Sequence, residues 1–459
     1  MRQTTESLKK NRSVPIFLGV FLALGVIMVW EAASSHAQYS WTSTTDSVSG
    51  EVHKIRVRRG DWRLQVDYKG DIRVSEDDSA IAYVGADSFL EIDERRDGER
   101  RRLMATPGAD GEPELAYFVD RKPADLDREA HKWLAEILPR IYRTTGLDAE
   151  GRVTRLLAAG GVDAVLKEIG QIGSDSVERL YLGHLLTQAE LTTAELERVL
   201  RRIAREVGSD HEMRQILAAL PMTTLIEEST ANAFVIAAGT VGSDFELRQL
   251  LIGFLDRPDF DPAVCEALID SARTIGGDYD LAEFLSRVVR VYPADRPLPM
   301  SYAKALKTIG TDYELRKALS AALHREGLRR EELEGLLAGA GTIGSDHDLS
   351  ELLIELVETR GGDLPPAFFR AAGTIGSDFD HARVLNTIVA LPNLSPETLV
   401  ATLESSLGIG SDHELGQLLI RLAGAYPIDG ALRPAFERAA ASVGSDYQRK
   451  QVWAAAGEG

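Results

Sequence analysis

The sequence contains a single cysteine, Cys265, among its 459 residues. One cysteine cannot form an intrachain disulfide, and Cys265 does not follow a signal segment where a lipid is attached. A lone cysteine of this kind is usually a small buried hydrophobe inside a helix. We therefore expect neither redox chemistry nor a lipid anchor from this residue.

Catalytic and metal-binding patterns are also missing. The nine histidines form no His-Glu-x-x-His pair, none is placed near Cys265, and no Gly-x-Ser-x-Gly sequence occurs. Residues 339 to 344 match the dinucleotide-binding string Gly-x-Gly-x-x-Gly, but they follow no predicted strand, which that site requires. The sequence predicts a protein that is not an enzyme and that uses no cofactor or metal.

Positive charge is in deficit, with 52 Lys and Arg against 71 Asp and Glu and a formal net charge of −19. Residues 131 to 459 carry 33 Lys or Arg against 48 Asp or Glu, so most of the excess lies in this part of the chain. An acidic field disfavours nucleic acid and anionic lipid. We expect a basic or neutral protein or peptide as partner, and no nucleic acid.

Long apolar runs are absent except for one, from Val14 to Trp30, which contains no charged residue. Basic residues precede it, and Ser35-His36-Ala37 before Gln38 fits a cleavage site. Residues 1–37 are therefore expected to be either a cleaved signal peptide or an uncleaved inner-membrane anchor. Either way, the rest of the chain is expected in the periplasm or cell envelope of a bacterium.

The segments that follow differ in pattern. Residues 38–50 are rich in Ser and Thr, which is typical of a flexible tether. Residues 51–122 alternate polar and apolar side chains and contain two Asp-Gly pairs, which predicts a small antiparallel β-module with hairpin turns. In residues 123–160 the apolar spacing becomes helical, and these residues are expected to link the module to residues 161–459.

The β-module contains an arginine-rich hairpin around Asp97-Gly98. Charged side chains on an edge strand protect it from aggregation, and that is one interpretation. The other is a cationic surface that meets phosphate headgroups, an anionic envelope polymer or the acidic repeats. The sequence leaves these alternatives open. The hairpin arginines are Arg95, Arg96, Arg100, Arg101 and Arg102.

After residue 160 a phrase of Ile or Val, Gly, Ser and Asp, here called the corner, recurs nine times with small variations. Its aspartates are 35, 34, 34, 34, 34, 32, 34 and 34 residues apart, and apolar residues flank each one at helical spacing. The predicted fold class is mainly α: a right-handed α-solenoid of nine two-helix repeats after the antiparallel β-module. The corner aspartates are Asp175, Asp210, Asp244, Asp278, Asp312, Asp346, Asp378, Asp412 and Asp446.

The corner has a chemical interpretation. We expect Gly to take the left-handed conformation that ends the first helix, and Ser or Asp to accept hydrogen bonds from the amides that open the second. Asp persists where Ser is replaced by Gly277 or Thr311. We therefore expect Asp to do a shared structural job, either as a helix cap or as a bond to the adjacent repeat.

In eight of the nine repeats, the residue after the corner aspartate is His, Phe or Tyr, whose side chain carries a ring. Stacked repeats would align these side chains. The rings either pack between repeats or form a peptide-binding stripe. A row of calcium sites along the corner aspartates is less favoured, because one carboxylate per repeat supplies too few ligands for calcium. The candidate partner-binding residues are His211, Phe245, Tyr279, Tyr313, His347, Phe379 and His413.

The first and last repeats place Glu178 and Arg449 at a column that is apolar elsewhere. A solenoid must close its core against water at both ends, so we expect these repeats to be polar caps. Partner binding is then expected on the middle repeats, roughly residues 244 to 420.

The period and helix pairing of residues 145 to 459 resemble the HEAT and armadillo-type helical solenoids. The repeat phrase is also similar to exported regions of antirepressor-type regulatory membrane metallopeptidases, although the peptidase part is absent. The class resemblance implies a scaffold or adaptor that binds a protein or peptide on a concave face. The alternative is a membrane-anchored envelope sensor or a regulatory partner of a signalling or protease system.

Overall fold

The computed structural model describes residues 27–31, 37–46, 50–109 and 112–457, with side chains from residue 52 onward. The chain divides into two compact units, Met1–Arg155 and Leu156–Gly459, and each is described by itself. Residues 14–26 of the expected signal or anchor lie outside the described residues, as do residues 35 and 36 of the expected cleavage site. Within the described residues, no helix has the length and apolar character needed to cross a membrane.

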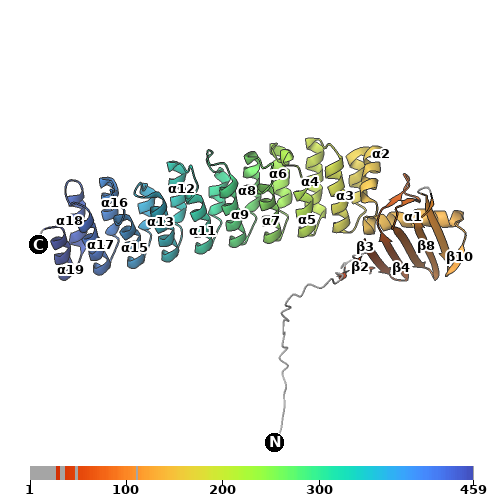
Figure 1. The fold of residues 1–459 in the computed structure, drawn as a ribbon, viewed down its shortest axis with the longest axis horizontal. Coiled ribbons are helices and arrows are strands. Elements are labelled where there is room, and N and C mark those ends of the chain that lie inside the picture. The colour runs from red at the N-terminus through yellow and green to blue at the C-terminus, as the bar shows by residue number, and fades with distance from the viewer. Residues whose placement is uncertain (1–26, 32–36, 47–49, 110–111, 458–459) are drawn as a thin grey trace, which may run out of the picture. The chain divides into compact units, whose positions relative to one another are not determined.

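The first unit is built on an antiparallel sheet with the strand order β1-β2-β3-β4-β7-β8-β9-β10 (Figure 1), and β5 and β6 form a second, two-stranded sheet that contributes to the same core. Neighbours in this sheet are mostly neighbours in sequence, which is why short turns suffice to connect them. The strands are β1 Ile27–Glu31, β2 Ala37–Asp46, β3 Gly50–Arg59, β4 Trp62–Lys69, β5 Ile72–Val74, β6 Ile81–Val84, β7 Phe89–Arg96, β8 Glu99–Pro107, β9 Pro113–Val119 and β10 Lys122–Ala124.

The expected flexible tether over residues 38–50 is a strand for most of its length. Strand β2 pairs residue by residue with β3, from Ala37 opposite Arg59 to Asp46 opposite Gly50. Its Tyr, Trp and Thr residues favour extended structure, a preference that outweighs the Ser and Thr content on which the tether interpretation relied. The last residues of the expected apolar segment, from Ile27 to Trp30, likewise lie in strand β1.

One face of this sheet is covered by helix α1 (Arg128–Thr145). The inward residues of the strands, such as Val66, Ile92 and Leu103, are buried together with Leu134 and Leu138 of the helix. Asp127 caps the helix by accepting from the N–H groups of residues 129 and 130, and the helix ends at residue 146, a glycine with φ 70°.

A carboxylate lies within this otherwise apolar core. Glu94 occupies an inward position of β7 and is buried. The indole N–H groups of Trp62 and Trp133 donate to its two oxygens at 2.6 and 2.7 Å. A buried charge is costly unless hydrogen-bonded, so this pairing allows Glu94 to occupy a position where the alternating pattern favours an apolar residue.

The second unit consists of consecutive helix pairs, as the repeats predict (Figure 1). Helix α2 (Ala149–Ile169) begins in the first unit and has non-helical backbone at Gly160 and Gly161. The helices that follow are α3 Asp175–Gln188, α4 Thr193–Glu206, α5 Asp210–Ala218, α6 Glu228–Ala238, α7 Asp244–Leu255, α8 Cys265–Ala272, α9 Asp278–Val291, α10 Met300–Leu306, α11 Asp312–Leu323, α12 Arg330–Ala340, α13 Asp346–Arg360, α14 Pro366–Ala372, α15 Asp378–Val389, α16 Pro396–Ser406, α17 Asp412–Ala425, α18 Leu432–Ser442 and α19 Asp446–Ala455, with short 3₁₀ helices η2 Met222–Leu225 and η3 Pro262–Val264.

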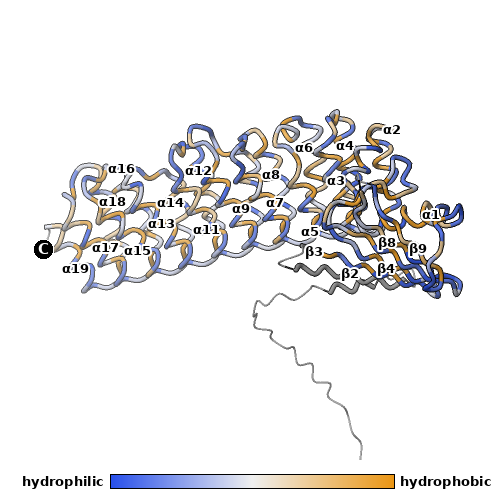
Figure 2. The backbone as a smooth tube through the Cα atoms, turned by 45° about the vertical axis from the view of Figure 1, so that its right-hand side comes forward, coloured by the Kyte–Doolittle hydropathy of each residue, from blue (hydrophilic) through white to orange (hydrophobic). Residues whose placement is uncertain are grey.

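The helices of this unit form two layers. Odd-numbered helices from α3 to α19 pack on one another, and even-numbered helices from α4 to α18 form the other layer. Apolar and polar stretches alternate along each helix (Figure 2), because one side faces the opposite layer and the neighbouring repeats. The predicted series of nine helix pairs, preceded by an antiparallel β-module, is therefore confirmed.

Candidate binding surface

Every odd-numbered helix from α3 to α19 begins at a corner aspartate. The serine before it is the cap: in six of these helices its Oγ accepts from the N–H three residues later, at 3.2 to 3.4 Å. Gly277 and Thr311 make no side-chain cap bond. Capping therefore belongs to serine, and the aspartate is free for another task.

The aspartate binds the next repeat. The carboxylate of Asp244 accepts from the N–H of Gly276 at 3.0 Å and from the N–H of Gly277 at 2.7 Å. These two donors lie at the following corner, so the bond joins consecutive repeats. The bond to the next corner glycine recurs for Asp210, Asp278, Asp312, Asp346, Asp378 and Asp412, at 2.7 to 3.0 Å.

We call this series the aspartate ladder. Burial alone would raise the pKa of Asp278, but the donors at Gly310 and Thr311 outweigh it and the net pKa is lowered. In the first repeat, Asp175 is also close to the following corner: its carboxylate would lie 3.5 Å from a Cβ atom built on Gly208. At the other end, the side chain of Asp446 is 85% exposed and pairs with Arg449 of its own helix.

The expected left-handed corner glycine is not found. None of the nine corner glycines has a positive φ, so the first helices end without that conformation. In five repeats the first helix ends four residues before the corner glycine, and a threonine hydroxyl donates to a carbonyl of the last turn, as Thr240 does to Ala237 at 2.7 Å. The same bond is made by Thr274, Thr308, Thr342 and Thr374.

The ring column lies on the surface. Phe245, Tyr279, Tyr313 and Phe379 are between 53% and 60% exposed, which contradicts packing between repeats as their main role. The candidate histidines His211, His347 and His413 are exposed too, and Tyr447 extends the series into the last repeat. We call these exposed side chains the ring ladder.

Cations stand between the rings. The guanidinium of Arg248 lies 5.5 Å from the ring centre of Phe245 and 5.7 Å from that of Tyr279. Lys317, from the following repeat, lies 5.1 Å from the ring centre of Tyr279, and Arg316 lies 5.5 Å from that of Tyr313. Each contact restrains the ring without burying it.

The same cations join adjacent repeats through ion pairs. An arginine four residues after one corner aspartate pairs with the acid two residues after the next, as Arg248 does with Asp280 at 2.7 Å and Arg316 with Asp348 at 3.0 Å. The pairs Arg179–Glu212 and Arg214–Glu246 follow this rule. In Lys317–Glu283 and Arg383–Glu351 the direction is reversed, because the cation, five residues after its own corner aspartate, pairs with the glutamate five residues after the preceding one. The arginine column is visible in the sequence, although our sequence interpretation did not use it.

The first repeat does not have the expected polar face. Glu178 is only 7% exposed, and one of its oxygens has no hydrogen-bond partner. Burial, together with the nearby Asp175 and Glu206 carboxylates, raises the pKa of Glu178 to about 7 despite the opposing effect of Arg202. In the last repeat Arg449 is half-buried and donates to the carbonyl of residue 443 at 2.8 Å. The cap interpretation is therefore wrong for Glu178.

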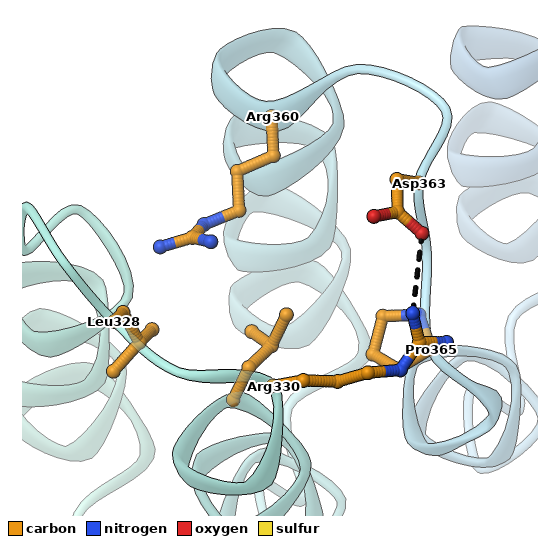
Figure 3. Close-up of a pocket in the computed structure, with 6 residues that line it drawn as sticks. Leu328, Arg330, Arg360, Asp363 and Pro365 are labelled. Atoms are coloured by element: carbon orange, nitrogen blue, oxygen red, sulfur yellow. Dashed lines mark hydrogen bonds and ion pairs between the residues drawn. The ribbon is translucent and has the colours of Figure 1, made fainter.

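A cavity of about 270 Å³ lies on the loop edge of the repeats, away from the corners (Figure 3). Both of its guanidinium groups are engaged: Arg330 with Asp363 at 3.4 Å, and Arg360 with the carbonyl of Leu323 at 3.1 Å. Leu328, Leu333 and Pro365 complete the lining. Nothing in this cavity forms an acid, base and nucleophile constellation.

The remaining reactive groups add no chemical site. Cys265 is buried, and burial raises the pKa of its thiol to about 12, so the thiolate is not populated. Within the described ranges, no group of three or more His, Cys, Asp or Glu residues is placed to hold a metal ion. No family model, curated protein or solved structure matches this chain.

Proposed function

We propose that this protein is a non-enzymatic, extracytoplasmic scaffold or adaptor that holds a protein or peptide partner against its ring ladder. The observation that carries the proposal is the exposure of Phe245, Tyr279, Tyr313 and Phe379 at the same position of their repeats, with the exposed His347 in the repeat between the last two. Isolated exposed rings are common on proteins, but an aligned series on a rigid framework provides the aromatic anchors in which binding energy concentrates.

The framework supports this use because it fixes the rings before a partner arrives. The aspartate ladder and the ion pairs restrain each repeat relative to the next, so little conformational entropy is lost on binding. The flanking acids, such as Asp280 and Asp348, are already paired with arginines. We expect an extended segment with apolar or basic side chains at intervals that match the repeats.

The helix pairing favours membership of the HEAT and armadillo-type solenoid class, and the similarity to exported parts of antirepressor-type metallopeptidases suggests an envelope regulator. A second candidate function is therefore a membrane-anchored sensor or regulatory partner of a signalling or protease system. The part of the apolar run that precedes strand β1, from Val14 to Val26, supports it if that part is retained as an anchor. Mass spectrometry of the N-terminal peptide of the protein purified from cells distinguishes a retained anchor from a cleaved signal peptide. A mature chain that starts near Gln38 would contradict the sensor proposal.

The scaffold proposal is tested by photo-crosslinking in intact cells. A photoreactive phenylalanine analogue is placed at Tyr279, Tyr313 or Phe379, and, as matched controls, at Ile236 or Met300, which are exposed hydrophobic residues of the even-numbered layer. We expect one discrete crosslinked species from the ring positions only. The crosslinked partner, once purified, should bind the Tyr279→Ala/Tyr313→Ala variant at least tenfold more weakly than the Ile236→Ala/Met300→Ala variant. Equal crosslinking from both layers, or equal affinity of the two variants, would contradict the proposal.

A further inference from the structure

A row of arginines crosses the sheet of the first unit. Arg58 of β3 is in register with Arg63 of β4, Arg63 with Arg95 of β7, and Arg95 with Arg100 of β8. Side chains in register on neighbouring antiparallel strands point to the same face, and such strands are about 4.8 Å apart. The four residues, here called the arginine row, therefore form a line about 14 Å long.

The arginine row faces away from the core of its unit. The neighbours Val57, Leu64 and Glu94 point to the other face, where they are buried with helix α1. Arg58, Arg63 and Arg95 are exposed. Their charges therefore project from the side of the sheet that α1 does not cover.

Three of these charges are not balanced. Arg100 is held by Asp93 at 2.9 Å, and Arg102, in the next row, is held by Glu91 at 2.8 Å. Among the side chains that the structure describes, Arg58, Arg63 and Arg95 have no salt-bridge partner. Like charges directly opposite one another destabilise a sheet, and among the described residues no acidic side chain pairs with any of these three.

We propose that the arginine row binds a linear polymer of phosphate groups. A guanidinium presents a planar pair of donors that matches phosphate oxygens, and it stays charged at any physiological pH. Charges arranged in a line suit an extended polyanion better than a single small anion. The row contains no ring on which a nucleobase could stack, which favours a base-free polymer over nucleic acid.

The register also separates this proposal from binding to the headgroups of an anchoring bilayer. Strand β1 enters the sheet at Ile27, opposite Thr42, which is itself opposite Lys54. Lys54 precedes Arg58 by four residues, about 13 Å along the strand. A chain that emerged from a membrane before Ile27 would therefore enter the sheet near the middle of β2 and β3, about 13 Å from the arginine row.

The test measures binding of the full chain to long-chain inorganic polyphosphate at several salt concentrations. We expect affinity to fall as salt rises, and Arg63→Gln/Arg95→Gln to weaken binding roughly 20-fold. The matched control is Arg121→Gln/Lys122→Gln, which removes the same charge from two exposed residues at the start of β10 and should leave affinity unchanged. Without polymer, the Arg63→Gln/Arg95→Gln variant should melt at the same temperature or higher, because repulsion is relieved.

Four results would overturn the inference. They are equal weakening by the two double variants, orthophosphate binding as tightly as the polymer, single-stranded DNA of equal charge binding more tightly than polyphosphate, and binding only to vesicles that contain anionic phospholipid. Retention of most of the affinity by Arg63→Lys/Arg95→Lys at low salt, with a larger loss at high salt, would support guanidinium-specific contacts to phosphate.

Discussion

At the scale of single residues, the corner aspartates act between repeats. Each carboxylate from Asp210 to Asp412 accepts from the backbone at the next corner, whereas the serine before it caps its own helix. Two residues that look like alternative caps in the sequence thus have separate tasks. This division explains why the aspartate persists at corners whose serine is replaced, as at Gly277 and Thr311.

Replacing Asp244 by Ala should lower the free energy of unfolding by about 2 kcal/mol, because it leaves the N–H groups of Gly276 and Gly277 without their charged acceptor. Chemical denaturation measures this change. The internal control is Asp446→Ala. The exposed Asp446 carboxylate pairs with Arg449 of its own helix, so this change should cost about 0.5 kcal/mol or less. Equal losses in the two variants would show that the aspartate acts only within its own helix.

Glu178 should make stability depend on pH in the opposite sense to an ordinary carboxylate. Its pKa is raised to about 7 by burial, so between its ordinary value of 4.5 and 7 the folded protein holds a proton that the unfolded chain has lost. Stability therefore decreases as pH rises through this window. We expect Glu178→Gln to raise the melting temperature at pH 8 and to have little effect at pH 5; a pH-independent difference would be inconsistent with this reasoning.

At the scale of helices and strands, the corners show how a glycine can recur without a left-handed conformation. A Cβ on Gly276 would stand 3.7 Å from the carboxylate of Asp244, an ordinary contact distance. Gly327, in the loop between α11 and α12, is different: its φ is 70°, and a Cβ there would lie 2.4 Å from the carbonyl oxygen of Ala294.

Gly276→Ala should therefore change the free energy of unfolding by less than about 1 kcal/mol. Gly327→Ala should cost about 2 kcal/mol or more, since it combines a left-handed backbone with a steric clash. Thermal melts of the two variants in parallel make the comparison. A larger loss for Gly276→Ala would mean that the corner glycine is required for a reason that the spacing of atoms does not reveal.

The sequence predicted the repeats well because their signals are local and occur nine times. The apolar spacing around Asp312, for example, reverses at the residue where α11 begins. Strand β2 was missed because its partner β3 makes it a strand, and pairing cannot be read from one segment alone. The burial of Glu178 and Glu94 was missed because it depends on neighbours distant in sequence, such as Arg202 and Trp133.

The sequence predicted the positions of the candidate binding residues but not whether their side chains are exposed or buried. The ring column is visible in the sequence, yet exposure and burial are both compatible with a ring at the start of a helix. Exposure follows from the geometry of the stack, in which Arg248 and Lys317 lie beside Tyr279 without covering it. Such contacts join residues about 35 positions apart, so the periodic sequence implies that they recur but not which atoms meet.

At the scale of the whole molecule, the corner aspartates, which are the carboxylates that recur along the repeats, are engaged in hydrogen bonds and not left for a metal. Those from Asp210 to Asp412 accept backbone hydrogen bonds one repeat further on, and within the described residues no cluster offers three or more ligands. We expect EDTA, or added calcium, to leave the melting temperature unchanged. A shift of several degrees with either reagent would point to a metal along the aspartate ladder instead.

The aspartate ladder also has a direction, since each repeat gives its carboxylate to the repeat that follows. The bond from Asp346 to Gly376 has the same length as the others although this step is 32 residues long, because the shorter connection lies on the opposite edge, between α13 and α14. Whole repeats can thus be gained or lost by duplication and deletion without a mismatch at the corners. Loop length varies more on the far edge than at the corners, as the connections α3–α4 and α7–α8 illustrate.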